Sequence, residues 1–341
     1  MDNKITKQRL FDFFSYEWIA IIIVAVVAMI FWELVYTIGA VRLTPGQQFK
    51  YYYDYSIDSS STSPLMNILI KDGDGNSVFS YDVLEFKTES LNKDFPQVLE
   101  ARVGIQEGDF IITDCIDYTK QEGADENTEK TIRLKQLVDT YKGYAYTELY
   151  KDAVKYLESF LPDGVAFNGE ISFDKLSKDK IEQVFRQRMA KDNRFRAEEQ
   201  IVNGIALEEK RIEKLCKEVV DFGKLLSLAE EYPELFYNYT KYEQSHALTT
   251  DQKLKEQYKG AIELEKEKGR ENAPYALCVS ALKGGQGKTD PTTYFKIAGK
   301  STADGVAIMV FDFHNEQPHL QYEVISAINQ IVRQCSTLLD N

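Results

Sequence analysis

The sequence predicts an α/β protein in which an N-terminal transmembrane helix precedes the α/β domain and the middle region is helical. Three observations support this prediction. A long apolar run lies near the N-terminus, strand-like segments occur on both sides of the middle of the chain, and a charged segment with helical periodicity separates them. Strands at both ends of a helical middle are typical of a domain whose distant segments meet in one sheet.

The apolar run from Trp18 to Ile38 predicts a membrane anchor over residues 18–40. A helix needs about 20 residues to cross roughly 30 Å of hydrocarbon. Between Ile19 and Phe31, nine Ile, Val and Phe side chains each favour insertion by about 0.3–0.6 kcal/mol, which gives about 4 kcal/mol in total. The sequence contains no second apolar run of this length.

Four residues of the anchor are expected to position it in the lipid bilayer, which are Trp18, Trp32, Glu33 and Tyr36. Trp and Tyr are enriched at membrane interfaces, and a carboxylate costs least there. Glu33 is therefore predicted either to lie at the interface without a further role or to contact another membrane subunit.

The flanking charges predict the orientation of the anchor. Three basic residues precede the run and two follow it, which are Lys4, Lys7, Arg9, Arg42 and Lys50. The positive-inside rule then places residues 1–17 in the cytoplasm, residues 41–64 in a tether, and residues 65–341 in an extracytoplasmic domain. The alternative is a cleaved signal peptide, but Ile38–Ala40 has no clear Ala-x-Ala site, so an uncleaved anchor is favoured.

Composition excludes several classes of function. A formal net charge of −13 argues against a nucleic-acid partner, which would need a basic face, and against docking on anionic lipid. The cysteines Cys115, Cys216, Cys278 and Cys335 are widely spaced without any CxxC, so no metal site is predicted. Their apolar surroundings leave buried thiols and disulfides both open, with three possible full pairings. No cofactor is predicted.

The first half of the domain shows several strand and helix patterns. A hairpin is expected from Met66–Lys71 and Val78–Phe86, with a turn at Asp72–Asn76 that lacks the Gly and Glu of a calcium loop. A strand–helix–strand unit is expected next, formed by Val83–Phe86, Phe95–Val103 and Phe110–Asp114. Two further strand candidates are Tyr144–Leu149 and Val165–Phe173.

The segment from Ser177 to His246 predicts a helical insertion at about 177–246. Apolar residues recur every three, four or seven positions, which favours one buried stripe. The intervening charges are expected on the solvated face; they include Glu208, Glu209, Lys210, Arg211 and Glu213. Strands at Tyr275–Leu282 and Gly305–Asp312 and a helix at Leu320–Cys335 are expected to close the domain.

Lys283–Thr289 is similar to a phosphate-binding loop, which would make the protein a P-loop-like NTPase. Asp290-Pro291 follows at once and would bring a carboxylate to the phosphates. Too little chain remains for the parallel sheet that normally follows, and the predicted location is extracytoplasmic. A surface loop is therefore favoured.

The three histidines, His246, His314 and His319, accompany no nucleophile motif, so no catalytic site is predicted from them.

Three segments resemble bacterial extracellular solute-binding proteins of the type 2 periplasmic class, in particular single-pass membrane relatives associated with ABC importers. They are Val98–Asp114, which carries Gly-Asp before an apolar strand, Tyr275–Leu282 and Gly305–Asp312. The resemblance implies two α/β lobes, a cleft for a small-molecule solute, delivery to an ABC permease or other membrane subunit, and no catalysis. Two departures are the lack of a cysteine before Cys115 and the lack of tryptophan beyond the anchor.

Candidate ligand-binding residues follow from the rule that α/β folds bind ligands at the carboxyl ends of their strands. Thr88, Ser90, Asp114 and Asp117 satisfy it, and each is equally explained as a turn or cap residue. The alternative function is an envelope scaffold or protein-interaction module without a small ligand, which would use Ser177–His246 as its partner surface.

Overall fold

The computed structural model describes residues 18–39, 47–91, 95–105, 107–115, 143–238, 272–282, 284–311 and 322–340, with isolated positions between these ranges. The chain divides into two compact units, Met1–Thr44 and Pro45–Asn341.

The first unit contains the helix α2, which spans Trp18–Gly39. Its large apolar side chains from Ile22 to Val35 are exposed, from 45% at Val26 to 71% at Trp32, whereas Ile21 is half-buried. Within this helix, residues 21–35 are the longest continuous segment whose side chains the structure describes. Over the described residues of the whole chain, no helix has both the length and the apolar character that crossing a membrane requires. The predicted anchor over residues 18–40 stays a prediction.

The second unit is built on one six-stranded mixed sheet with the order β2-β1-β3-β6-β5-β4. The strands are β1 (Gln48–Tyr53), β2 (Glu85–Ser90), β3 (Phe110–Asp114), β4 (Phe236–Asn238), β5 (Pro274–Cys278) and β6 (Val306–Val310). β1 pairs in parallel with β2 and β3, and the remaining pairs are antiparallel. Ile112 lies opposite Ile308, which confirms that segments from both ends of the domain meet in one sheet.

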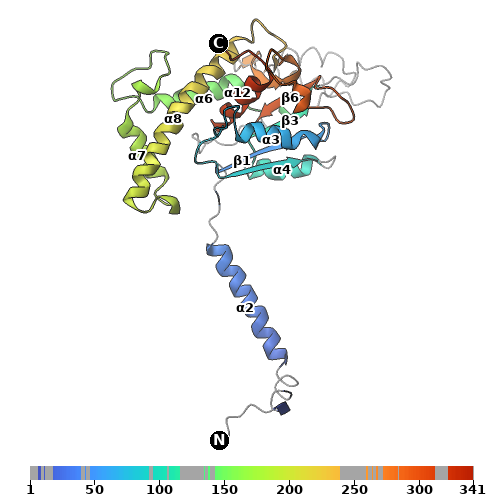
Figure 1. The fold of residues 1–341 in the computed structure, drawn as a ribbon, viewed down its shortest axis with the longest axis vertical. Coiled ribbons are helices and arrows are strands. Elements are labelled where there is room, and N and C mark those ends of the chain that lie inside the picture. Colours follow the sequence, from blue (N-terminus) through green and yellow to red (C-terminus); the bar gives the residue numbers. More distant parts are fainter. Residues whose placement is uncertain are drawn as a thin grey trace. The chain divides into compact units, whose positions relative to one another are not determined.

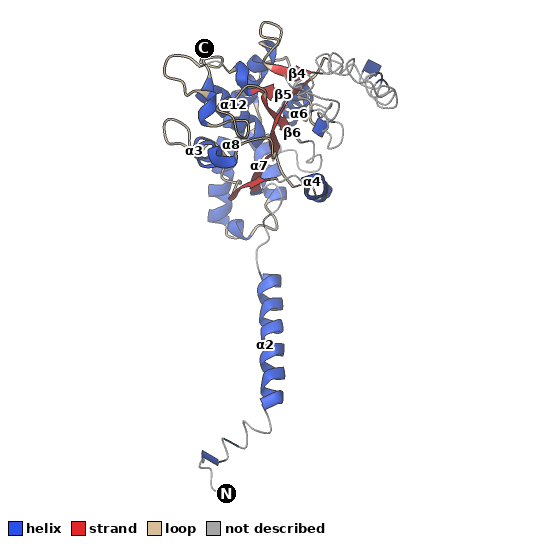
Figure 2. Ribbon diagram, turned by 90° about the vertical axis from the view of Figure 1, so that its right-hand side faces the viewer, coloured by secondary structure: helices blue, strands red, loops and turns tan. Residues whose placement is uncertain are grey.

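Helices cover both faces of this sheet (Figures 1 and 2). They are α3 (Thr62–Ile70), α4 (Phe95–Gly104), α6 (Tyr146–Glu158), α8 (Glu198–Ser227) and α12 (Glu323–Cys335). α7 (Lys178–Arg188) packs against α8. Successive strand residues point to opposite faces. Tyr51 and Phe110 accordingly pack in the core with α3, α6, α8 and α12, whereas Tyr52 and Ile111 pack with α4. The α/β class and the helical middle region are confirmed. The predicted bounds of about 177–246 are corrected, because α8 ends at Ser227 and strand β4 lies at Phe236–Asn238.

The predicted strand–helix–strand unit is confirmed as β2, α4 and β3. All five residues of β3 are buried, as its continuous apolar character predicts. β2, however, begins at Glu85 and not at Val78 or Val83. Likewise β5, β6 and α12 confirm the three carboxy-terminal elements, with the described part of the last helix beginning at Glu323. The predicted strand Tyr275–Leu282 is too long, because β5 ends at Cys278 and Val279–Ala281 form a short 3-10 helix.

The predicted strand Met66–Lys71 is wrong, because all of it except Lys71 belongs to α3. Leu65 and Leu69 are both buried, and their four-residue spacing is that of a helix face. The turn at Asp72–Asn76 is present, with the Asp72 N–H donating to the Asn76 carbonyl at 2.9 Å. The turn closes an isolated antiparallel bridge between Lys71 and Ser77, but it follows α3 and leads into a loop, so the predicted pair of hairpin strands is wrong.

The predicted tether over residues 41–64 is corrected, because β1 lies inside it. Phe49, Tyr51, Tyr52 and Tyr53 are at most 1% exposed, so this segment belongs to the core. The short 3-10 helix Ser59–Ser61 and the start of α3 also lie within residues 41–64.

Both additional strand candidates are wrong. Tyr144–Leu149 runs into α6, whose buried residues Tyr146, Leu149, Ala153 and Leu157 follow a helical spacing. Val165–Phe173 contains no strand; Val165 is exposed and Gly169 has a positive φ of 88°. The two lobes implied by the resemblance are also not found, because 45–341 forms one compact unit and its described residues contain one sheet.

The helix α8 continues through Gly204, which lies where α8 crosses α7. A Cβ at Gly204 would lie 2.3 Å from Cζ of Phe185 and 2.7 Å from Cε1 of Phe195.

We expect Gly204→Val to destabilise the protein by about 2 kcal/mol, because overpacking typically costs 1–3 kcal/mol. Urea unfolding measures this change. The control Ala206→Val, at an exposed position of the same helix, should change the free energy of unfolding by less than about 1 kcal/mol. Equal losses in both variants would contradict close packing at Gly204.

Candidate functional site

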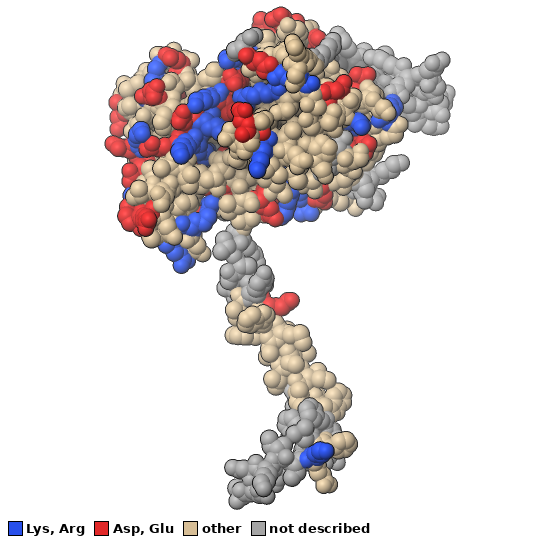
Figure 3. Space-filling model, in the orientation of Figure 1, with Lys and Arg blue, Asp and Glu red and all other residues tan. Residues whose placement is uncertain are grey.

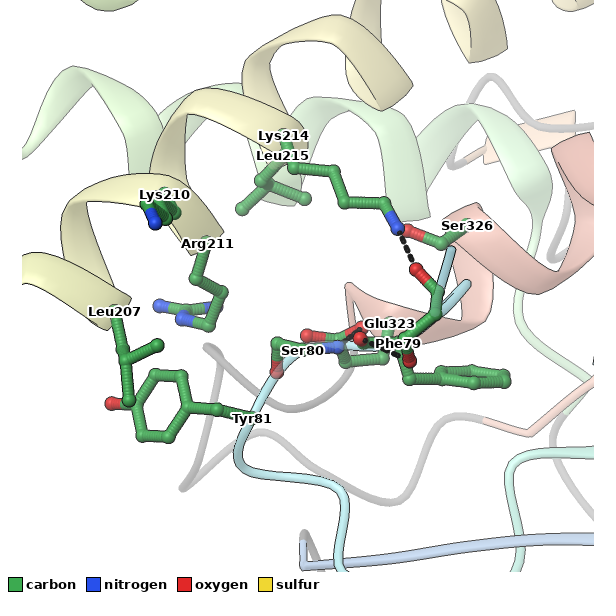
Figure 4. A pocket seen from close by; sticks show the side chains of 11 residues that line it. Phe79, Ser80, Tyr81, Leu207, Lys210, Arg211, Lys214, Leu215, Glu323 and Ser326 are labelled. Carbon is green, nitrogen blue, oxygen red and sulfur yellow. Dashed lines mark hydrogen bonds between the residues drawn. The ribbon is translucent and has the colours of Figure 1, made fainter. Parts of the chain in front are cut away.

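A pocket of about 180 Å³ lies between α8, the loop before β2 and the first turn of α12 (Figure 4). Its wall on α8 is formed by Leu207, Lys210, Arg211, Lys214 and Leu215. These positions recur at helical spacing, so one face of α8 supplies both the cations and the apolar contacts.

The loop supplies the second wall, through Ser77, Phe79, Ser80 and Tyr81. The Lys214 ammonium holds this loop against α8, because Nζ donates to the Ser77 carbonyl at 2.7 Å and the Val78 carbonyl at 2.8 Å. The pocket is therefore closed on one side by a hydrogen-bonded contact between helix and loop.

The third wall comes from Glu323 and Ser326 in the first turn of α12. The Glu323 carboxylate accepts the Ser80 N–H at 3.3 Å and is 8% exposed. Burial raises the pKa of Glu323, although Arg211 and the contacts with Ser80 act in the opposite direction. The pocket lining thus contains three cations and one carboxyl group that burial favours in its neutral form.

A buried charge network lies behind the pocket and is centred on Glu208, which is fully buried. Its carboxylate accepts Nε of Arg211 at 3.0 Å, Nη2 of Arg188 at 2.8 Å and the Tyr81 hydroxyl at 2.9 Å. Arg188 also pairs with the buried Asp82 at 2.8 Å. Burial would raise the pKa of Glu208, but the arginines outweigh it and the pKa is lowered to about 2.

This network corrects the prediction that the charges of the helical insertion are all solvated. Glu208 and Arg211 are buried, while Lys210 is exposed. Glu208 lies one helical turn after the buried Gly204, so it shares the stripe that faces α7 and the loop. The four-residue spacing from Gly204 to Glu208 was the available signal in the sequence.

The structure does not assemble the predicted ligand residues at this pocket. Thr88 lies in β2, and the exposed Ser90 is the last residue of that strand. The buried Asp114 is the last residue of β3, which β1 separates from β2 in the sheet. Asp117 lies outside the described residues. At that carboxyl edge the side chain of Asp54 accepts the Thr113 hydroxyl at 2.8 Å.

The pocket lies toward the opposite edge of the parallel strands. The loop that lines it leads into β2, and the Leu84 N–H donates to the Gln47 carbonyl at 2.8 Å, at the amino ends of β2 and β1. Of the predicted anchor residues, Trp18, Trp32 and Glu33 are exposed on α2, and the side chain of Tyr36 is not described.

The resemblance of Lys283–Thr289 to a phosphate loop does not extend to its structure. The Lys288 ammonium donates to the Arg333 carbonyl at 2.8 Å and to Asp340 at 2.6 Å. The loop is followed by the short 3-10 helix Pro291–Thr293, whereas a phosphate loop opens an α-helix. The surface-loop interpretation fits these contacts.

The four cysteines are thiols, with Cys115 half-buried and the other three buried. Among the described residues, no group of three or more His, Cys, Asp or Glu side chains has a metal-binding arrangement. The three histidines lie outside the described residues.

The fold and the pocket define an α/β protein with a small basic pocket at the edge of a mixed sheet. No family model, no characterised protein and no solved structure matches this chain.

Proposed function

We propose that this chain is a membrane-tethered, extracytoplasmic solute-binding protein that is non-catalytic and works with an ABC-importer permease or another membrane subunit. The observation that carries the proposal is the pocket of about 180 Å³, whose polar groups converge from α8, α12 and the loop. Pockets that combine apolar walls with a few placed polar groups are typical of small-molecule sites.

The proposed attachment to the membrane is supported by α2. Apolar side chains cover this helix and include Ile22, Val27 and Phe31, each at least 50% exposed. A water-exposed helix of this composition would be unfavourable, whereas the hydrocarbon core of a bilayer suits it. The basic residues before it support the proposed orientation.

A thermal-shift screen of the purified chain in detergent tests solute binding. A ligand at 100 times its Kd should stabilise the folded state by about 2.7 kcal/mol and raise the Tm by several degrees. Ser77→Trp, at the exposed rim of the pocket, should remove the shift because the indole enters the pocket mouth.

The control for this screen is Ser227→Trp, at an exposed position near the end of α8 and away from the pocket. This variant should retain the shift. A shift that survives Ser77→Trp would place the ligand elsewhere. If sugars, amino acids, organic acids and phosphate all fail to shift the Tm, solute binding is rejected.

The second candidate function is an envelope scaffold that uses the surface of α7 and α8. Two apolar side chains of α8, Val202 and Leu207, are 56% and 40% exposed, which suits a protein contact. For a scaffold without a small ligand, Val202→Asp should release a partner subunit, and no solute should shift the Tm of the wild-type chain. A solute-dependent Tm shift together with partner binding that Val202→Asp leaves unchanged would favour solute binding instead.

A further inference from the structure

We propose that the pocket binds a small organic acid, with the carboxylate held by the cations of α8 and a short apolar body against Phe79, Leu207 and Leu215. This inference rests on the proposed solute-binding function and deepens it, because it names the chemical class of the solute. Figure 4 shows the cations along α8 and, across from them, Ser80 and Glu323.

The charges of the lining favour an anion. Arg211 is balanced by Glu208, with Nη2 at 2.9 Å from the carboxylate. Lys214 is engaged with two neutral carbonyl groups, so its positive charge is not compensated by them. Lys210, in the same wall, has no ion-pair partner among the described residues. Two lysine charges therefore remain available to a ligand carboxylate.

The size of the pocket restricts the ligand. Typical pockets for drug-sized molecules have about 300–1,000 Å³. A volume of about 180 Å³ is smaller, which disfavours a nucleotide or an oligosaccharide. The apolar side chains in the lining give an uncharged ligand body a favourable contact, which inorganic phosphate does not use.

Glu323 adjusts the preference for an anion according to its protonation. The groups that face it are Arg211 and Lys214 on α8, the Ser80 N–H on the loop, and the buried Asp109 before β3. Burial raises the pKa of Glu323, and also raises the pKa of Asp109 to about 8. A protonated Glu323 repels no anion and can donate a hydrogen bond to it. Affinity for an anion should therefore fall as the pH rises through the raised pKa of Glu323.

Calorimetric titration of the full chain in detergent tests this inference with pentanoate and its uncharged counterpart pentanamide. Pentanoate should bind about ten-fold more tightly, because a charge-assisted hydrogen bond exceeds a neutral one by about a factor of ten in affinity. Lys210→Ala should weaken pentanoate binding about five- to ten-fold and leave pentanamide binding unchanged. Glu323→Gln should remove the fall in pentanoate affinity with rising pH.

The matched control is Lys217→Ala, which removes an exposed lysine of the same helix outside the pocket lining. It should change pentanoate affinity less than about two-fold. Pentanamide binding as tightly as pentanoate would overturn the organic-acid inference and leave solute binding intact. Lys210-dependent binding of phosphate alone would overturn it in favour of an inorganic anion. A chain that binds neither probe nor any other solute would overturn both proposals.

Discussion

Glu208→Gln is expected to destabilise the protein by about 3–5 kcal/mol. The substitution keeps the size of the side chain but removes the carboxylate that faces Arg188 and Arg211. The Nε and Nη1 atoms of Arg188 are already buried without a hydrogen-bond partner, so this guanidinium depends on its carboxylate contacts. Removing one partner of a buried ion pair leaves an uncompensated charge, and urea unfolding should show a matching loss of free energy.

The neighbouring Glu209 provides the control. Its carboxylate pairs with Lys178 at 2.8 Å, and the lysine side chain is 66% exposed. Exposed ion pairs contribute about 0–1 kcal/mol, so Glu209→Gln should have a small effect. Similar losses in the two variants would contradict a stabilising role for the buried network.

The same network predicts how stability depends on pH. The arginines lower the pKa of Glu208 from 4.5 to about 2 against the effect of burial. The ionised Glu208 therefore stabilises the folded state fully when the pH is above 4.5, the ordinary pKa of a glutamate. This contribution to the free energy of unfolding is lost as the pH falls from 4.5 toward 2. The wild-type chain should lose this part of its free energy of unfolding on acidification, whereas Glu208→Gln should not.

Val26→Arg is expected to release the protein from membranes. Arginine at the centre of a span costs about 2.5–3.5 kcal/mol, and the substitution also removes the favourable term of the valine. The apolar residues of α2 supply about 4 kcal/mol, so one arginine nearly cancels insertion. Alkaline carbonate extraction of membranes measures the bound fraction.

Val26→Leu is the matched control, and it should remain in the membrane pellet. Val26 is 45% exposed and lies in α2, within the unit Met1–Thr44, so neither change affects the core of the α/β unit. Val26→Arg retained in the pellet as completely as Val26→Leu would contradict the proposed anchor.

The buried strands and the last helix were predictable from the sequence because their patterns are local. β3 and β6 are continuous apolar runs, and the buried stripe of α12 follows helical spacing. β1 was missed although Phe49–Tyr53 is strongly β-forming, because its position after the apolar run suggested a tether. α3 was mistaken for a strand because a short apolar run fits both periods.

The pocket was not predictable for a different physical reason. Its walls come from residues near positions 80, 210 and 323, which only the tertiary fold brings together. The carboxyl-edge rule selected Thr88, Ser90 and Asp114, whereas the pocket lies toward the amino ends of β1 and β2. In the charge run Glu208–Glu213, the spacing from Gly204 is the one signal for a buried Glu208. The sequence does not reveal its partners, because Arg188 and Tyr81 reach it only across the tertiary contact.

The most direct test of the proposed tethered, extracytoplasmic solute-binding protein is labelling of intact cells with a membrane-impermeant, amine-reactive biotin reagent. Lys151, Lys178 and Lys217 are 66–71% exposed and should react before lysis. We expect the same peptides to be labelled in intact and in lysed cells. Labelling of these lysines only after lysis would place the α/β unit on the cytoplasmic side and contradict the proposed extracytoplasmic location.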